Sequence, residues 1–465
     1  MPDVILALDI GTTTCKGRWM RTDGAVEAET VLHYASAEHL FNPHDWWEAL
    51  TRTLQQLGAP TPSRPLGICL CGRGGGLALL DASGEPVEVP WPRVLARARD
   101  YSVGHRAPGR AAAWAAQYRA LREIAPGAAD RVVRLCGVKD YLNMRLTGEW
   151  ATDASSAGCR AWPDDVDALG IAPEALPQIR DAREVLGSVR ADTGFPLPVG
   201  LPVLVGSHDG VCANIGAGML AVADGCVTLG TNGVLRVNTL EALPPTAEFA
   251  AFTYPYLAGT WTSGGDVLYG GAAVVWVGRL LGILDDSPEG FRTGLARLDA
   301  LAASVSAGAN DLVFVPYLRG TISPRRMPDR RGMFFGVAAA HGPREFARAA
   351  FEGTALALRH IRDAFLSHGG RIRRLCLTGG GVRSGVWPAI VASVLAVPLD
   401  RGDPEASSRG AAILAAVGLG IYPSVEAASA AMVPAGPVVA PDPSWVARYD
   451  RAYIRYRSIA EADPS

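Results

Sequence analysis

Short runs of apolar residues recur along the chain and predict buried β-strands. The first run, residues 4–8, reads Val-Ile-Leu-Ala-Leu without a polar interruption. Such a run is typical of a strand that is covered on both faces. Similar runs lie at 67–71, 202–205, 226–229, 312–315 and 374–377. Segments with apolar residues at helical spacing lie between them, most clearly 343–367 and 386–395. The alternation of strands and helices predicts an α/β fold.

The chain is too long for a single core. Its 465 residues favour two domains. A polar, proline-containing stretch at residues 241–246 separates two halves, each with a glycine-rich turn after a strand. We therefore expect an N-terminal domain at residues 1–241 and a C-terminal domain at residues 242–465.

Composition and charge indicate a globular protein that acts on a small molecule. Hydrophobic residues make up 49% of the chain, charged residues make up 19%, and the formal net charge is -2. Because the arginines are spread out, no basic tract points to nucleic acid or membrane. The first nine residues lack signal-peptide features, and the eight cysteines sit singly in apolar settings, which predicts a cytoplasmic protein with reduced thiols. A homodimer is compatible with this sequence.

The first strand is followed by a turn that is suited to phosphate. Asp9-Ile10-Gly11-Thr12-Thr13 combines small residues, hydroxyl groups and a carboxylate. Backbone amides and hydroxyls there can bind an anion, and the carboxylate can hold Mg²⁺ through water. A tight turn capped by its Asp and Thr side chains is the alternative interpretation.

Two further turns follow strands in the second half of the chain. Gly230-Thr231-Asn232-Gly233 offers amides and a hydroxyl, and is also typical of an Asn-Gly hairpin. Gly379-Gly380-Gly381 leads through Ser384 into a helix. Glycines there would let a flat adenine lie against the backbone, although a flexible strand-to-helix loop would look the same.

Asp209 is the candidate catalytic carboxylate. It follows a strand in the segment Gly206-Ser207-His208-Asp209-Gly210, at the mouth of an α/β unit where catalytic residues gather. There it could accept the proton of an acceptor hydroxyl during phosphoryl transfer. Its alternative role is a helix N-cap, and His208 beside it would contact substrate or pack.

In their order and spacing these motifs resemble those of the FGGY carbohydrate kinases, and the resemblance spans nearly the whole chain. Further matching segments lie at 139–141, 145–149, 152–156, 314–318, 331–336 and 352–355. The resemblance implies two ribonuclease-H-like domains of the actin-like ATPase type around a central cleft. It also implies ATP-dependent phosphorylation of a small sugar or polyol, such as xylulose or a C4 to C6 polyol.

The resemblance assigns a role to each motif. Asp9, Gly11, Thr12 and Thr13 would bind phosphate, and Gly230 and Thr231 would close on the γ-phosphate. Gly379, Gly380, Gly381, Ser384 and Ser408 would line the adenosine site. Asp209 would be the base and, with Asp9, a ligand of Mg²⁺. Gly75, Asp153, His208 and Asp209 would contact the sugar.

The sugar-binding segments depart from the family pattern. Arg73-Gly74-Gly75-Gly76 stands where ketopentose kinases commonly have Gln-Met-His-Gly, and Trp91-Pro92-Arg93 replaces a Trp-x-Asp pattern. Arg73 and Arg93 could recognise the carboxylate of a sugar acid. Alternatively, Arg73 or Arg93 could form an internal ion pair, for example with Asp81 or Asp100, and we favour a neutral substrate. From another class, an actin-like nucleotide switch without transferase activity is disfavoured by Asp209.

Overall fold

The computed structural model describes residues 1–34, 42–102, 110–158, 172–195, 197–285 and 287–462. It divides into two compact units. Unit 1 comprises Met1–Gly218, Phe252–Trp261 and Ala406–Pro434, and unit 2 comprises Met219–Ala251, Thr262–Glu405 and Ala435–Ser465. The boundary expected after residue 241 falls inside the first segment of unit 2.

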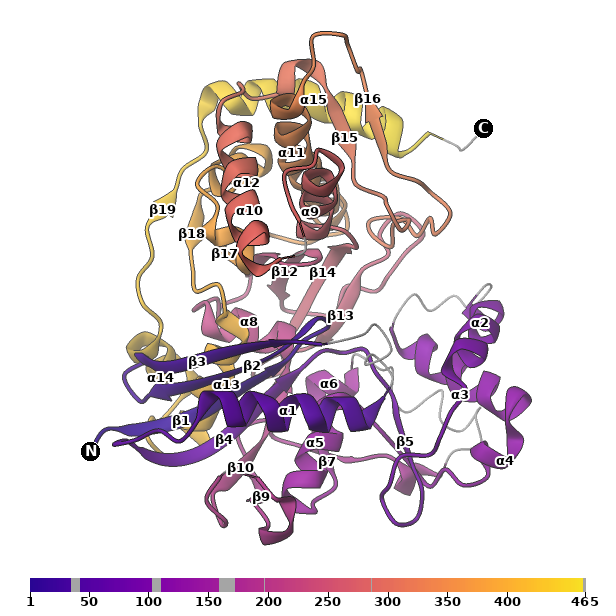
Figure 1. The fold of residues 1–465 in the computed structure, drawn as a ribbon, viewed down its shortest axis with the longest axis vertical. Coiled ribbons are helices and arrows are strands. Elements are labelled where there is room, and N and C mark those ends of the chain that lie inside the picture. Colours follow the sequence, from indigo (N-terminus) through magenta and orange to yellow (C-terminus); the bar gives the residue numbers. More distant parts are fainter. Residues whose placement is uncertain (35–41, 103–109, 159–171, 196, 286, 463–465) are drawn as a thin grey trace. The chain divides into compact units, whose positions relative to one another are not determined.

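Unit 1 is built on a mixed six-stranded sheet (Figure 1). β1, β4 and β10 are parallel neighbours, whereas β2, β3 and β9 extend the sheet with antiparallel pairing. β1 is buried along almost its whole length, as its uninterrupted apolar run predicts. The order is β3 (Val26–His33), β2 (Thr14–Arg21), β1 (Asp3–Ile10), β4 (Arg64–Gly72), β10 (Pro202–His208) and β9 (Val185–Ser188).

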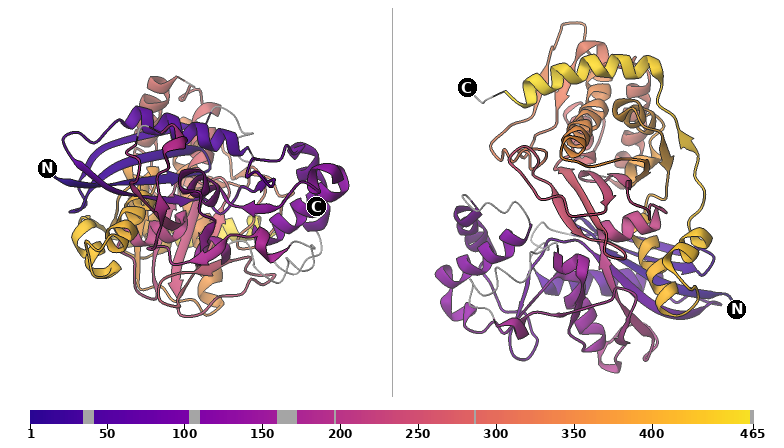
Figure 2. Two further views of the ribbon diagram at one scale, coloured as in Figure 1. Left: turned by 90° about the horizontal axis from the view of Figure 1, so that it is seen from below. Right: turned by 180° about the vertical axis from the view of Figure 1, so that it is seen from behind.

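Helices cover both faces of this sheet (Figures 1 and 2). α1 (Pro43–Leu57) and α5 (Val138–Thr147) pack on one face, and α8 (Asp209–Gly216) and α13 (Ala406–Gly418) pack on the other. α13 is followed by α14 (Val425–Met432). α8 and α13 approach so closely that a Cβ atom at Gly410 would lie 1.9 Å from the carbonyl oxygen of Cys212. A segment far along the chain thus completes the core of unit 1.

Smaller elements surround this sheet in unit 1. β5 (Ala78–Leu80), β6 (Arg134–Cys136), α2 (Trp91–Ser102), α3 (Arg110–Ile124) and α4 (Pro126–Ala129) share a separate apolar cluster. β7 (Ala151–Asp153) pairs with β8 (Gln178–Arg180) and leads directly into α6 (Ala154–Gly158). α6 packs beside β10 and β13 (Phe252–Pro255), so it lies close to the carboxyl end of β10.

Unit 2 has its own sheet. Its strands follow the order β14 (Trp261–Val267), β12 (Gly233–Thr239), β11 (Asp224–Leu229), β17 (Arg374–Thr378), β18 (Leu399–Arg401) and β19 (Val438–Val439). The run expected at 312–315 forms β15 (Val313–Val315), which pairs with β16 (Met333–Phe335) outside this sheet. The helices are α9 (Gly271–Leu280), α10 (Pro288–Ala303), α11 (Pro343–Ser367), α12 (Trp387–Leu395) and α15 (Pro443–Ala460). The helix predicted at 343–367 is confirmed by α11.

No helix in the described part of the chain is both long and apolar enough to span a membrane. The described cysteines are all buried free thiols, namely Cys15, Cys69, Cys71, Cys136, Cys212, Cys226 and Cys376. Cys159 lies outside the described residues. Burial raises the pKa of Cys15 and of Cys226 to about 12, and it raises the pKa of Cys69 well above its ordinary value.

We expect these thiols to resist modification in the folded protein, because the reactive thiolate form is scarce and shielded. In a Cys159→Ser background, a disulfide reagent at pH 8 should label none of the seven described cysteines until urea is added. The same protein in urea is the control and should release the full seven equivalents. Rapid labelling of the native protein would contradict the expectation.

Candidate active site

Three parallel strands of unit 1 bring the candidate catalytic groups to one edge of the sheet. Asp9 at the end of β1 lies opposite Cys71 of β4, and Cys71 lies opposite Ser207 of β10. With strands spaced at about 4.8 Å, the ends of β1 and β10 are separated by roughly 10 Å. Burial, a hydrogen bond with Cys212 and repulsion from the Asp9 and Asp209 carboxylates all raise the pKa of Cys71. Both carboxylates therefore lie close enough to β4, the strand between them, to affect the pKa of its Cys71.

The phosphate turn expected after β1 is a tight hairpin. The amide of Gly11 donates to the carbonyl oxygen of Thr14 at 2.9 Å, and the Thr12 and Thr13 side chains are exposed at the tip. Lys16, which none of the sequence motifs includes, lies beside this turn, and its Nζ is 3.8 Å from Oδ2 of Asp9. The antiparallel register pairs Lys16 directly with Asp9. A hairpin centred on residues 11–14 would have indicated this cation beside the turn.

Arg73 forms hydrogen bonds with the backbone of the same hairpin. Its guanidinium is buried and donates Nη1–H to the carbonyl oxygens of Gly11 at 3.2 Å and Thr12 at 3.4 Å. Nε donates to the carbonyl oxygen of Gly75 at 3.1 Å. Asp81, one of the partners considered for an internal ion pair, accepts from its own turn at Ser83 and Glu85. Arg73 thus links the loop that follows β4 to the hairpin that follows β1.

The other predicted sugar contacts near this loop differ in exposure. A Cβ atom at Gly75 would meet no atom within 4 Å, so the loop is open there. Arg93 lies exposed in the first turn of α2 and makes no ion pair with the residues that the structure describes. The side chain of Asp100, its other candidate partner, lies outside the described residues. Arg93 is the more accessible of the two arginines.

Asp209 is the first residue of α8, and its side chain is 32% exposed. His208 occupies the N-cap position, where its Nδ1 accepts from the amide of Gly210 at 3.0 Å. The alternative that Asp209 is itself the cap is therefore wrong. Because Nδ1 accepts, the neutral imidazole carries its proton on Nε2, which lies 3.3 Å from Oδ1 of Asp209.

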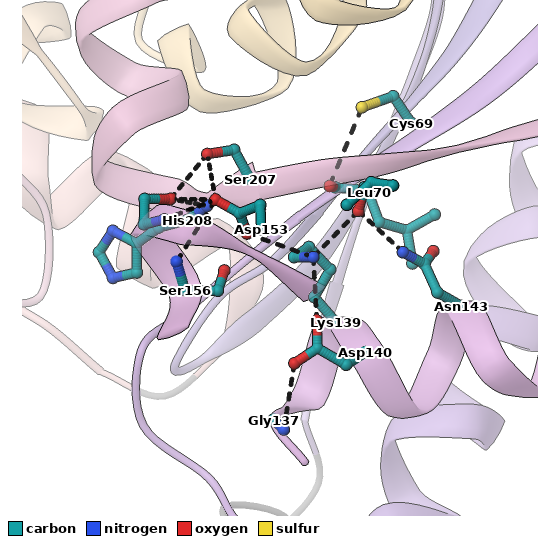
Figure 3. Close-up of polar contacts among 12 residues, drawn as sticks. Cys69, Leu70, Gly137, Lys139, Asp140, Asn143, Asp153, Ser156, Ser207 and His208 are labelled. Atoms are coloured by element: carbon teal, nitrogen blue, oxygen red, sulfur yellow. Dashed lines mark hydrogen bonds and ion pairs between the residues drawn. The ribbon is translucent and has the colours of Figure 1, made fainter. Parts of the chain in front are cut away.

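Asp153 lies near Ser207 and His208, the last residues of β10 (Figure 3). The residue is only 2% exposed. Oδ2 accepts from the amide of Ser155 at 3.0 Å and from the hydroxyl of Ser207 at 3.0 Å. Oδ1 lies 3.4 Å from Nζ of Lys139. The carboxylate is therefore directed at protein groups rather than at the surface.

Unit 2 places its two glycine-bearing segments at the carboxyl ends of adjacent parallel strands, β11 and β17. The carbonyl oxygens of Gly230 and Thr231 accept from the amides of Gly271 and Gly270 at 2.8 and 3.0 Å, which fixes the turn against the start of α9. Gly379 has a φ of 81°, and a Cβ atom there would lie 2.7 Å from the carbonyl oxygen of Leu229.

The remaining residues of the predicted adenosine site have distinct surroundings. Gly380 has open space where a Cβ atom would lie, whereas Gly381 is buried against Leu229. The hydroxyl of Ser384 accepts from the amide of Trp387 at 2.8 Å at the start of α12, and it donates to Asp299 of α10. Ser408 is fully buried in α13, which belongs to unit 1. Asp299 was missed, since nothing local in the sequence links it to Ser384.

Each unit therefore combines an α/β sheet with small-residue turns at the carboxyl ends of its parallel strands. In unit 1 these turns carry two carboxylates, and in unit 2 they offer open backbone suited to a nucleotide. The class of protein that this arrangement defines is a two-domain phosphotransferase of the actin-like ATPase type.

Comparison with known proteins agrees with this class. Residues 117–216 match the N-terminal domain of the FGGY family of carbohydrate kinases, and residues 225–419 match its C-terminal domain. The chain is 27% identical to a xylulose kinase of Escherichia coli K12 over 89% of each chain. It is 26% identical to a gluconokinase of Bacillus subtilis over 92% of this chain and 90% of that one.

A solved structure of xylulose kinase from Rhodospirillum rubrum is 28% identical, covers 98% of both chains and superposes with a TM-score of 0.79. The chain belongs to the FGGY family of carbohydrate kinases. It is an ATP-dependent carbohydrate kinase, as the sequence motifs predict.

Proposed function

We propose that this kinase phosphorylates a hydroxyl group of a small neutral sugar or polyol, such as a ketose of the xylulose type or a C4 to C6 polyol, with Asp209 as general base. The observation that carries the proposal is the position and exposure of the Asp209 side chain. Its carboxylate is partly exposed at the start of α8, is not used to cap the helix, and lies beside a buried histidine. The similarity to xylulose kinases supports a ketose as the first candidate.

In this mechanism Asp209 accepts the proton of the acceptor hydroxyl as the γ-phosphoryl group is transferred to its oxygen. His208 lies beside the carboxylate, with Nε2 3.3 Å from Oδ1 of Asp209 while Nδ1 accepts from the amide of Gly210. A carboxylate in this position suits a base, since it remains accessible to a ligand.

The residues at the strand ends also fit ATP and Mg²⁺. The described residues contain no group of three or more His, Cys, Asp or Glu side chains that could hold a metal ion. That suits Mg²⁺, which is commonly held by one or two carboxylates together with phosphates and water. Asp9 and Asp209 would supply the carboxylates, and bound Mg²⁺ would neutralise charge on the phosphates.

The turns of each unit contain groups that are suited to parts of ATP. In unit 1, the amides and hydroxyls of Gly11, Thr12 and Thr13, with Lys16, would bind phosphate. In unit 2, Gly230 and Thr231 would bind the γ-phosphate, and Gly379, Gly380 and Gly381 would lie along the adenosine. Ser384 would hold the start of α12 for this loop.

A neutral substrate is favoured over a sugar acid by the contacts of Arg73. Its guanidinium is buried and donates to three backbone carbonyl oxygens. This leaves exposed Arg93 as the arginine better able to reach a substrate carboxylate. Gly75 and His208 would contact a neutral sugar through backbone and imidazole groups. The similarity to gluconokinases keeps sugar acids among the compounds to test.

The test is a coupled assay of ADP release with Mg-ATP and a panel of ketoses, polyols and aldonic acids. We expect a ketose or polyol to give the highest kcat/KM, with Arg93→Gln changing it by less than about 3-fold because the arginine binds no carboxylate. A preference for an aldonic acid, lost in Arg93→Gln, would replace the neutral substrate by a sugar acid. If no compound stimulates turnover of protein that binds ATP, the nucleotide-switch alternative is supported.

A further inference from the structure

Strand β10 is interrupted just before the proposed base. Its register with β4 shifts between Leu204 and Ser207, where β10 contains one residue more than its partner. Gly206 permits this bulge, because its φ is 69° and a Cβ atom there would lie 1.9 Å from the carbonyl oxygen of Leu70. The bulge takes residues 205 and 206 out of the pairing with β4, which resumes at Ser207. The amides of residues 205 and 206 donate to the carbonyl oxygens of Glu184 and Ala182, and side chains hold the other polar groups of this segment.

Side chains from α5 hold the carbonyl end of the bulge (Figure 3). The carbonyl oxygen of Val205 accepts from Nζ of Lys139 and from Nδ2 of Asn143, each at 2.9 Å. Nζ of Lys139 also donates to Oδ1 of Asp140 at 2.9 Å and lies 3.4 Å from Oδ1 of Asp153. Lys139 is 2% exposed, so one buried ammonium group links the bulge to two carboxylates.

Asp153 and Ser155 hold the next residues of the same backbone. The hydroxyl of Ser155 donates to Asp153 and accepts from the amide of His208 at 3.2 Å. The hydroxyl of Ser207 lies 3.0 Å from Oδ2 of Asp153 and 2.8 Å from the hydroxyl of Ser155. These contacts end at His208, the residue that precedes the proposed base.

We propose that Asp153, together with Lys139 and Ser155, is a positioning residue for Asp209 and does not bind the sugar. Asp153 is buried, and its Oδ2 accepts hydrogen bonds from Ser155, Ser156 and Ser207. Removing its charge weakens the hydrogen bonds from the hydroxyls of Ser155 and Ser207. The backbone that these two residues hold then shifts, and the direction of the Asp209 carboxylate changes with it. Displacing a catalytic group by about 1 Å can cost 10²-fold in rate. The inference rests on Asp209 as the base proposed above.

The test compares Asp153→Asn and Ser155→Ala, each alone and in an Asp209→Asn background. Single-turnover rates with excess enzyme make the weakest variants measurable. We expect the single variants to lower kcat by about 10- to 100-fold while the KM for the sugar stays within about 3-fold. In the Asp209→Asn background the same changes should have little further effect, because the group that they position is already gone.

Ser156→Ala is the matched control. Ser156 is a buried neighbour that donates its amide to Asp153, and its hydroxyl makes no hydrogen bond with the described residues. It should keep full activity. If Asp153→Asn fails to fold, as judged by thermal unfolding, the milder Ser155→Ala decides the question.

Two results would overturn the inference alone, provided that Asp209→Asn lowers kcat strongly but leaves a measurable single-turnover rate. One is a large rise in the KM for the sugar at unchanged kcat, which would make Asp153 a substrate ligand. The other is a full additional loss in the Asp209→Asn background, which would mean that Asp153 acts independently of the base. Near-normal activity of Asp209→Asn itself would instead refute the proposed function.

Discussion

The substitution Asp209→Asn is expected to lower kcat by about 10²- to 10⁴-fold, because an amide cannot accept the proton of the acceptor hydroxyl. The side chain keeps its size and its place at the start of α8, where His208 remains the N-cap. Binding of ATP and of the sugar should change little, since the loss concerns proton transfer rather than affinity. Coupled ADP release at saturating ATP and sugar measures the effect.

Asp45→Asn is the matched control for this prediction. Asp45 also lies in the first turn of a helix in unit 1, and its carboxylate accepts from the side chain of Asn42. The same loss of charge at that helix end should leave kcat near its normal value. If Asp209→Asn retained activity within about 3-fold of the parent, the base would have to be another group.

The strands and the main helix of the fold could be predicted because their signals are local. β1 reads as an uninterrupted apolar run since helices cover both faces of its sheet, and α11 shows a regular helical period over 25 residues. The partner of β15 could not be predicted, because pairing depends on contacts distant in sequence. The return of residues 406–434 to unit 1 was missed for the same reason.

The candidate site shows the same division between local and distant information. Asp9 and Asp209 lie at the ends of parallel strands, as the strand pattern indicates. The partners of Arg73 are backbone carbonyl oxygens, which every residue has, so no sequence pattern could identify them. Gly410 of α13 permits close packing on α8, a contact between segments that are distant in sequence and that no local pattern indicates.

The substitution Lys139→Met is expected to reduce the free energy of unfolding by about 3–5 kcal/mol, the usual cost of removing one partner of a buried ion pair. Lys139 is the cation that faces both Asp140 and Asp153, and its side chain and both of theirs are almost completely buried. Without it, two carboxylates would lack their charge partner, and the carbonyl oxygen of Val205 would lose one donor. Urea unfolding followed by tryptophan fluorescence measures the change.

Arg97→Met removes an exposed ion pair with Glu123 and serves as the control, with an expected cost of about 1 kcal/mol or less. The double variant Lys139→Met/Asp153→Asn should recover part of the loss, because one of the two unpaired charges is then removed. A Lys139→Met protein as stable as the control would mean that the buried charges contribute little to folding. The bulge in β10 would then have to be held by Gly206 and the surrounding packing, and Asp153 would lose the partner through which it is anchored to α5.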